Sequence, residues 1–131
     1  MLAEYLQAPV TTSLGGRGAI PEDHPLCLIT AAPGKGAIVA QAEADVVLVA
    51  GCRLGALDLW GRPPAWGEPH VQKTIQIDVS GDVVGLNRPV DVGIVGEAKS
   101  TLKALLESVK EYTPPRRENP YLNKYKRLEE R

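Results

Sequence analysis

The sequence predicts an α/β fold of three layers, in which a parallel β-sheet carries helices on both of its faces. Two short runs of apolar, β-branched residues, Val46–Ala50 and Thr74–Val79, support this fold. Each run is too short for a buried helix and too apolar for a half-exposed strand, so both fit central strands of a parallel sheet. A third apolar run, Val90–Val95, is followed by a helical pattern at 97–112, as expected where strands alternate with helices.

The composition is that of an ordinary globular domain. The chain has 131 residues, which is long enough for one domain with a core. Its net charge of -1 favours neither a nucleic acid nor a membrane surface as a partner. No apolar run is long enough to span a membrane and no signal peptide is visible, so a cytoplasmic location is expected. Cys27 and Cys52 form no CxxC motif and are expected to be reduced.

The N-terminal third is predicted to contain short elements joined by tight turns. Residues 2–7 have the pattern of the last turns of a helix, which suggests that the chain starts partway through a structural unit. Residues 9–13 and 26–29 are expected to be short strands, with a glycine-rich breaker at 14–18 between them. An alanine-rich stretch at 37–44 is predicted to be a helix.

The turn before this helix is a candidate phosphate site. Gly34 and Gly36 precede the helix start, where backbone N–H groups point toward an anion. The third glycine of a dinucleotide fingerprint is absent, because Val39 stands in its place, and the Gly-Lys-Ser/Thr ending of a P-loop is missing as well. Lys35 either adds positive charge toward a phosphate or faces water.

The carboxyl ends of the strands are a second candidate site, because ligands of open parallel sheets bind outside these ends. Arg53 follows the first strand and is suited to hold a phosphate or carboxylate with two hydrogen bonds. Asp78 ends the next strand, where doubly wound folds place an acid on a ribose hydroxyl. Trp60 and Trp66, in the loop between these strands, either offer flat apolar area to a planar ligand or neighbouring domain, or order the loop by packing on its prolines.

The C-terminal part contains the clearest helical pattern and a charged tail. Residues 97–112 carry an apolar stripe with helical spacing, formed by Ala98, Leu102, Leu105, Leu106 and Val109. The tail 113–131 has mixed charges and the apolar spacing of a short amphipathic helix. This pattern favours a linker that docks on a further domain over a nucleic-acid contact.

Several segments occur together in an order typical of one enzyme family. They are Leu2-Ala3-Glu4, APVTTSLGGRGAIPEDHPL at 8–26, ADVVLVAGCRL at 44–54, KTIQIDVS at 73–80 and GLNRPVDVGIVGEAKSTLKALL at 85–106. The stretches GAIPEDHPL and NRPVDVGIVGEAK are the most specific of them. This collinear series resembles the central domain of thiamine diphosphate-dependent enzymes of the acetolactate synthase group.

The resemblance implies a six-stranded, Rossmann-like parallel domain that lies between two thiamine diphosphate-binding domains. Residues 1–112 would form this domain, without the first strand and helix that family members have before the LAE segment. Residues 113–131 resemble the linker into the third domain. The implied partners are the missing catalytic domains. An exposed sheet edge also predicts a homo-oligomer, a dimer or higher.

The resemblance implies that catalysis resides outside this chain. In the family, the glutamate that activates the cofactor belongs to the N-terminal domain, and the diphosphate–magnesium motif, Gly-Asp-Gly followed by Asn, belongs to the C-terminal domain. No Gly-Asp-Gly occurs here, and the two glutamates considered as substitutes, Glu4 and Glu97, stand in the wrong contexts. The isolated chain is therefore expected to be inactive, with thiamine diphosphate and Mg²⁺ bound only by the parent enzyme's other domains.

In some relatives the central domain binds FAD, in others it binds ADP, and in many it binds no nucleotide. By motif, Arg53 falls where an arginine contacts the nucleotide pyrophosphate, Asp78 at the adenosine ribose and Asp91 near the adenine. After Arg53 the sequence has LGALDLWG instead of the FDDR typical of acetolactate synthases, and PGKG at 33–36 replaces a Gly-His-Gly turn. These departures favour ADP or no nucleotide over FAD.

The resemblance therefore implies a structural central domain of an enzyme that decarboxylates or ligates 2-oxo acids. Its candidate nucleotide-binding residues are Arg53, Asp78, Asp91, Gly34 and Gly36. The alternatives are a stand-alone nucleotide-binding module and an oligomerisation module in which a partner supplies a missing strand. No catalytic residue and no metal ligand is assigned within the chain.

Overall fold

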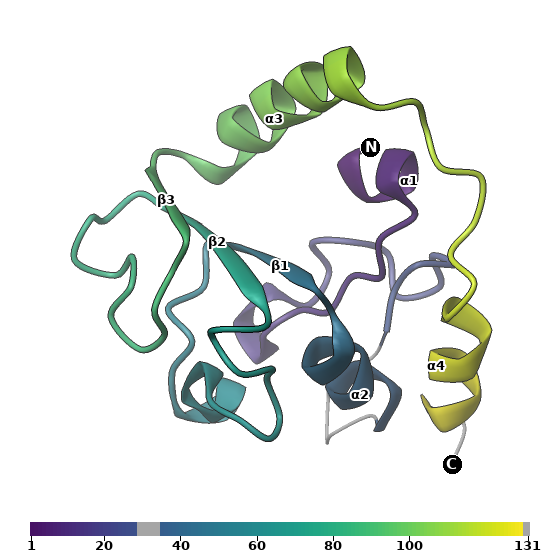
Figure 1. Ribbon diagram of the computed structural model, residues 1–131, viewed down its shortest axis with the longest axis horizontal. Coiled ribbons are helices and arrows are strands. Elements are labelled where there is room, and N and C mark those ends of the chain that lie inside the picture. Colours follow the sequence, from purple (N-terminus) through teal and green to yellow (C-terminus); the bar gives the residue numbers. More distant parts are fainter. Residues whose placement is uncertain (29–34, 130–131) are drawn as a thin grey trace. The chain divides into compact units, whose positions relative to one another are not determined.

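The computed structural model describes residues 1–28 and 35–129 (Figure 1). Its α-helices are α1 (Leu2–Leu6), α2 (Lys35–Glu43), α3 (Ala98–Tyr112) and α4 (Leu122–Glu129), and its 3₁₀ segments are η1 (Leu14–Gly16) and η2 (Ala56–Gly61). Its strands are β1 (Val46–Ala50), β2 (Lys73–Asp78) and β3 (Val92–Val95). None of the helices in the described ranges is long and apolar enough to cross a membrane.

The strands form one parallel sheet in the order β1-β2-β3 (Figure 1). Ala50 of β1 pairs with Ile77 of β2, and Ile77 pairs in turn with Ile94 of β3. This arrangement confirms the predicted α/β fold with a Rossmann-like parallel sheet. The first strand has the predicted bounds, while the second is shifted by one residue and the third begins two residues later than expected.

The sheet contains fewer strands than the family resemblance implies. Within residues 1–28 and 35–129, the expected strands 9–13 and 26–29 are represented by a single parallel bridge between Val10 and Cys27. Ile29, the last residue of the second of these, lies outside the described residues. The five strands expected in this chain, which would lack the first of the family's six, thus correspond in the described residues to three strands and one isolated bridge.

The chain divides into two compact units. Unit 1 comprises Met1–Ala40 and Lys103–Arg131, and unit 2 comprises Gln41–Leu102, which includes the whole sheet. The predicted amphipathic helix of the tail is present as α4 and belongs to unit 1. The boundary at residue 112 and a role for the tail as a linker to a further domain remain predictions.

Unit 1 has a small apolar core around the start of α2. Leu28, Ala37 and Tyr125 are each at most 6% exposed and pack in one cluster. Beside Ala37, Gly36 has no room for a side chain, because a Cβ atom there would meet the backbone carbonyl of Tyr125 and the side chain of Glu129. Helix α4 therefore packs closely on the first turn of α2.

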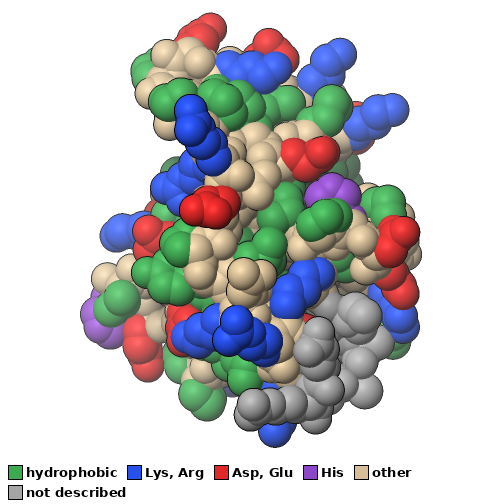
Figure 2. All heavy atoms as spheres, turned by 90° about the vertical axis from the view of Figure 1, so that its right-hand side faces the viewer, with side chains coloured by type: hydrophobic (Ala, Val, Ile, Leu, Met, Phe, Trp, Pro, Cys, Tyr) green, Lys and Arg blue, Asp and Glu red, His purple; other side chains and the backbone are tan. Residues whose placement is uncertain are grey.

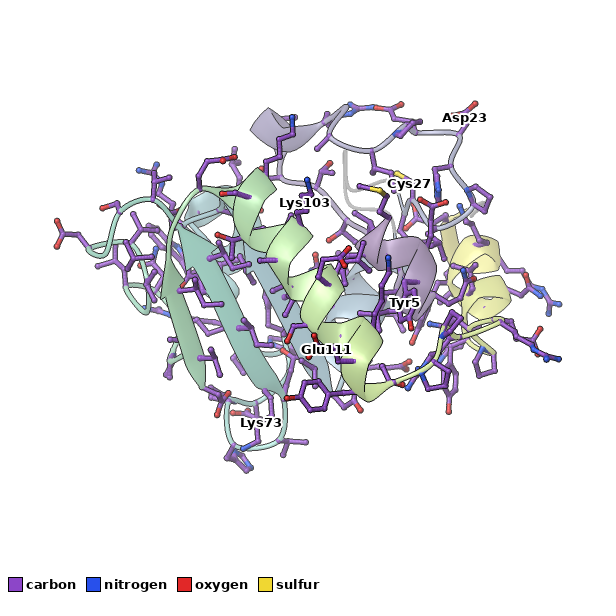
Figure 3. The ribbon with its side chains drawn as sticks, turned by 90° about the horizontal axis from the view of Figure 1, so that it is seen from above. Tyr5, Asp23, Cys27, Lys73, Lys103 and Glu111 are labelled. Carbon is purple, nitrogen blue, oxygen red and sulfur yellow. The ribbon has the colours of Figure 1, made fainter. Side chains whose placement is uncertain are left out.

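Hydrogen bonds between distant parts of the sequence complete unit 1. The hydroxyl of Tyr5 on α1 donates to the carbonyl oxygen of Thr113 at 2.6 Å, and Lys126 Nζ donates to the carbonyl oxygen of Cys27 at 2.6 Å. Figure 3 shows Tyr5 on its helix and Cys27 in the segment that follows η1. These bonds tie the tail to the N-terminal segment.

Unit 2 connects its parallel strands by loops and a short 3₁₀ segment. Residues 51–72 join β1 to β2 and contain η2, while residues 79–91 join β2 to β3 through turns. One face of β2 meets these connections with polar side chains, since Thr74 is fully buried and Gln76 is 2% exposed. The central strand predicted at 74–79 is thus present and buried, but the side chains on this face are polar.

Arg88 is the centre of the buried polar contacts in unit 2 and is 2% exposed. Its guanidinium group donates four hydrogen bonds of 2.7–2.9 Å, which reach Thr74 Oγ1, Gly61 O, Gly67 O and Gln72 Oε1. Burial lowers the pKa of Arg88, and the charges of Asp91 and Glu68 oppose that shift. Arg88, which lies between β2 and β3, thus fixes the loop between β1 and β2 against β2.

Charged side chains of both signs occur together on one face of the molecule. Figure 2 shows one face of the molecule, on which Lys and Arg side chains alternate with Asp and Glu side chains and with hydrophobic ones. No patch of a single sign dominates this face. The mixed surface agrees with the net charge of -1.

Candidate functional site

The loop after β1 and the end of β2 lie next to each other at the carboxyl edge of the sheet. The N–H group of Gly51 donates to the carbonyl oxygen of Ile77 at 2.9 Å, which continues the pairing of the two strands by one residue. Across β2, the N–H group of Gly96 donates to the carbonyl oxygen of Asp78 at 2.9 Å. Arg53, shortly after β1, and Asp78, the last residue of β2, therefore lie at neighbouring strand ends, as the sequence predicted.

Arg53 presents an exposed side chain on this loop. Its backbone carbonyl accepts a hydrogen bond from Asn87, but its guanidinium group makes no hydrogen bond or ion pair with any residue in the described part of the chain. A guanidinium group with its donors unused by the protein is available for a phosphate or carboxylate.

Asp78 is half-buried, and its carboxylate is already oriented by the backbone. Its Oδ1 atom accepts a hydrogen bond from the N–H group of Ser80 at 3.0 Å, two residues further on. Such a turn fixes the side chain at the strand end. An oriented carboxylate is suited to accept a hydrogen bond from a ligand hydroxyl.

Asp91 lies at the opposite edge of the sheet. It immediately precedes β3, and its Oδ2 atom accepts a hydrogen bond from the N–H group of Thr74, at the start of β2, at 2.8 Å. Lys73, labelled in Figure 3 at the beginning of β2, reaches the other carboxylate oxygen at 3.7 Å. The structure thus does not bring Asp91 together with Arg53 and Asp78, because parallel strands place all their first residues at one edge.

The glycine turn before α2 is only partly described. Gly34 lies outside the described residues, and Lys35 has an exposed side chain. Gly36 is buried against α4, and the next N–H group, that of Ala37, donates to Glu129 Oε1 at 2.6 Å. A carboxylate of the chain itself therefore occupies the first turn of this helix, where a phosphate was expected.

Two amide side chains that the sequence analysis did not single out hold the loop that carries Arg53. Gln76 Nε2 donates to the carbonyl oxygen of Cys52 at 3.0 Å, and Asn87 Nδ2 donates to that of Arg53 at 3.0 Å. The alternation of polar residues along β2 was the available signal for Gln76. For Asn87, no signal in the sequence indicated its partner.

The neighbouring tryptophan and cysteine side chains pack within the connections. Trp66 is 7% exposed, its indole N–H donates to the carbonyl oxygen of Asp58 at 2.9 Å, and its ring lies 6.0 Å from the Arg88 guanidinium group. This favours the loop-ordering role that the sequence left open for Trp66, whereas Trp60 is 45% exposed. Cys27 and Cys52 are both free thiols, as predicted.

No cluster of acidic, histidine and cysteine residues suited to a metal ion occurs in residues 1–28 and 35–129.

Comparison with known proteins shows the family of the chain. Residues 1–105 match the thiamine pyrophosphate enzyme central domain. A probable acetolactate synthase large subunit from Methanocaldococcus jannaschii is 38% identical over 110 residues, with 82% of this chain and 18% of the relative covered. A sulfoacetaldehyde acetyltransferase from Roseovarius nubinhibens is 37% identical over 118 residues, with 80% and 18% covered.

Human 2-hydroxyacyl-CoA lyase 1 is 32% identical over 108 residues, with 82% of this chain and 18% of the relative covered. The matched region thus spans 18% of the length of each of these three relatives. The family match covers most of the chain and agrees with the parallel sheet. The chain therefore belongs to the family of thiamine pyrophosphate enzyme central domains.

Proposed function

We propose that this domain binds a nucleoside diphosphate at the carboxyl edge of its sheet and serves as the central scaffold of a thiamine diphosphate-dependent enzyme. In that enzyme, other domains would hold the cofactor and its metal ion and would act on 2-oxo acids or related acyl donors. The observation that carries the proposal is the location of two groups at adjacent strand ends. One is the Arg53 guanidinium group, which has no partner among the described residues, and the other is the Asp78 carboxylate, which is oriented by the backbone.

Each of the two residues has a defined role in the proposed site. Arg53 would hold the diphosphate with its exposed guanidinium group, which has no partner among the described residues. Asp78 would accept a hydrogen bond from a ribose hydroxyl, through a carboxylate that Ser80 already orients. Asp91 is left out of this site because it lies at the amino edge of the sheet.

The experiment is a calorimetric titration of the purified chain with ADP and, separately, with FAD. We expect saturable binding of ADP, with a loss of about tenfold or more in affinity for Arg53→Ala and for Asp78→Ala. Arg62→Ala is the matched control, since Arg62 is an exposed arginine on the same connection and should not affect binding. Absence of binding by the unchanged chain would contradict the nucleotide site and leave the scaffold role.

A second function, oligomerisation, is favoured by one face of the sheet. The register puts Val46, Leu48 and Val92 on the same face, and their side chains are 51%, 36% and 48% exposed. Apolar side chains this exposed on a regular surface are typical of contacts with another subunit or domain. Light scattering should detect a dimer or larger species that Leu48→Glu disrupts, and a monomer at all concentrations would contradict this function.

A further inference from the structure

The loop from Gly51 to Gly55 has a backbone conformation that is unfavourable for one of its residues, Leu54. Gly51 has φ of 67°, and Leu54 has φ of 57°, in the left-handed region that is costly for a residue with a branched side chain. Leu54 is nevertheless 2% exposed and therefore fixed in place. Such a conformation persists only where surrounding contacts determine it.

The contacts that determine this loop come from β2 and from the connection that follows it. Gln76 is buried and donates to the carbonyl oxygen of Cys52, while its Oε1 atom accepts a hydrogen bond from the N–H group of Gly85 at 2.8 Å. Asn87 donates to the very next carbonyl oxygen, that of Arg53. Two consecutive carbonyl groups are thus fixed by two amide side chains.

We propose that Asn87 is the positioning residue for Arg53. By holding the backbone carbonyl of Arg53, Asn87 fixes the direction in which the Arg53 guanidinium group leaves the loop toward a diphosphate. This inference rests on the proposed nucleotide site. Asn87 is half-buried and its bond to Arg53 is near the surface, whereas Gln76 is enclosed by the unit. Asn87 can therefore be changed with less disturbance to folding than Gln76.

The advantage of this arrangement is preorganisation. A mobile arginine must lose side-chain and backbone freedom when a ligand binds, and this loss weakens the affinity. With the carbonyl of Arg53 tied to Asn87, the backbone part of that loss occurs on folding. Removing the Asn87 amide should lower the affinity only as long as Arg53 itself contacts the ligand.

The test is a double-mutant cycle for ADP binding with Asn87→Ala, Arg53→Ala and the combined variant. We expect Asn87→Ala to weaken binding about fivefold, as for the loss of one hydrogen bond. The combined variant should bind no more weakly than Arg53→Ala, because Asn87 acts through Arg53. Losses that multiply in the combined variant would overturn the proposal. Asn123→Ala, an exposed position in unit 1, is the matched control.

A second measurement reports on the loop without any nucleotide. The Cys52 thiol donates to Asp58 Oδ2 and accepts the N–H group of Leu54, both at 3.4 Å, and burial raises its pKa. Asn87→Ala should therefore increase the rate at which iodoacetamide modifies Cys52 by several fold, while the rate at Cys27 in unit 1 stays unchanged. An unchanged rate at Cys52 would overturn the inference.

The two measurements separate this inference from the function on which it rests. If the unchanged chain fails to bind ADP, the proposed nucleotide site is wrong, and the positioning role for a diphosphate falls with it. The Cys52 rate still decides whether Asn87 holds the Arg53 loop. If ADP binds and the cycle is additive, the nucleotide site stands and the positioning role alone is wrong.

Discussion

Units 1 and 2 both bury apolar side chains, but they differ in the buried contacts at their centres. In unit 1 the centre is apolar, where Leu28, Ala37 and Tyr125 pack in one cluster. In unit 2 the buried residues around β2 include Arg88 and Thr74, which are hydrogen-bonded to each other at 2.9 Å. The comparison shows how one short chain stabilises a helix pair by packing and a set of loops by directed hydrogen bonds.

The two kinds of contact respond differently to substitution. An apolar cluster adjusts partly when one group changes, so its losses are graded. A buried hydrogen-bond network leaves several groups without partners when its centre is removed, and each of them was desolvated on folding. Substitutions at the centre of unit 2 should therefore have larger effects than substitutions in unit 1.

The largest effect is expected for Arg88→Met, which keeps apolar bulk and removes all four hydrogen bonds. Thr74, Gln72 and the carbonyl groups of Gly61 and Gly67 would lose their buried donor. We expect the free energy of unfolding measured in urea to fall by about 3 kcal/mol.

Two further variants serve as comparisons for Arg88→Met. Arg88→Lys should recover little of the loss, because one ammonium group cannot reach the same acceptors as the planar guanidinium fork. Substitution of an exposed arginine, Arg62→Met, should change the free energy of unfolding by less than about 0.5 kcal/mol. Equal effects at both arginines would contradict the central role of Arg88.

An intermediate effect is expected for Gly36→Ala in unit 1. The added methyl group would overlap the backbone of Tyr125, so α4 must shift away from α2. We expect a loss of about 2 kcal/mol in unfolding free energy, together with faster hydrogen exchange in 122–129. Gly15→Ala is the matched control, since a Cβ atom at Gly15 meets nothing within 4 Å. Unchanged exchange in α4 would show that the helices do not pack as described.

The smallest effect concerns the two thiols, one in each unit. Burial is the main cause that raises the pKa of both Cys27 and Cys52 above the ordinary thiol value. The folded chain therefore keeps thiol protons that the unfolded chain has already released, so stability should fall as the pH rises above about 8.5. Replacing either cysteine with alanine should reduce the slope of unfolding free energy against pH, measured by urea unfolding at a series of pH values. Identical slopes in the three proteins would contradict the expectation.

The sequence predicted the elements of the fold better than their mutual contacts. Hydrophobic periodicity identified Val46–Ala50 to the residue and the helix at 98–112 within one residue, because both patterns are local. The strands expected at 9–13 and 26–29 contribute one bridge in the described part of the chain, since β-branched residues favour an extended backbone without specifying a partner strand.

The positions of two candidate residues could be predicted for geometric reasons, whereas their role in binding stays a prediction. Arg53 follows β1 and Asp78 ends β2. Because the carboxyl ends of parallel strands share an edge, their location at the same edge could be inferred from the strands alone. Asp91 precedes its strand and therefore belongs to the other edge, which strand direction indicates but motif matching does not. The buried Arg88 was missed because its partners lie 14 to 27 residues away in sequence, mainly in loops without a periodic pattern.

Unit 1 is made of two segments that are separate in the sequence, and this sets an order of events in folding. The hydrogen bonds that close this unit join residues 92, 99, 108 and 112 positions apart, whereas the Arg88 bonds of unit 2 span at most 27. Closing a longer segment of chain costs more entropy, and distant pairings form more slowly than local ones. During synthesis, all residues of unit 2 are present once position 102 has been added, whereas unit 1 cannot close until the tail has been added. The sheet should therefore form first, and the N-terminal segment should be the last part to become protected.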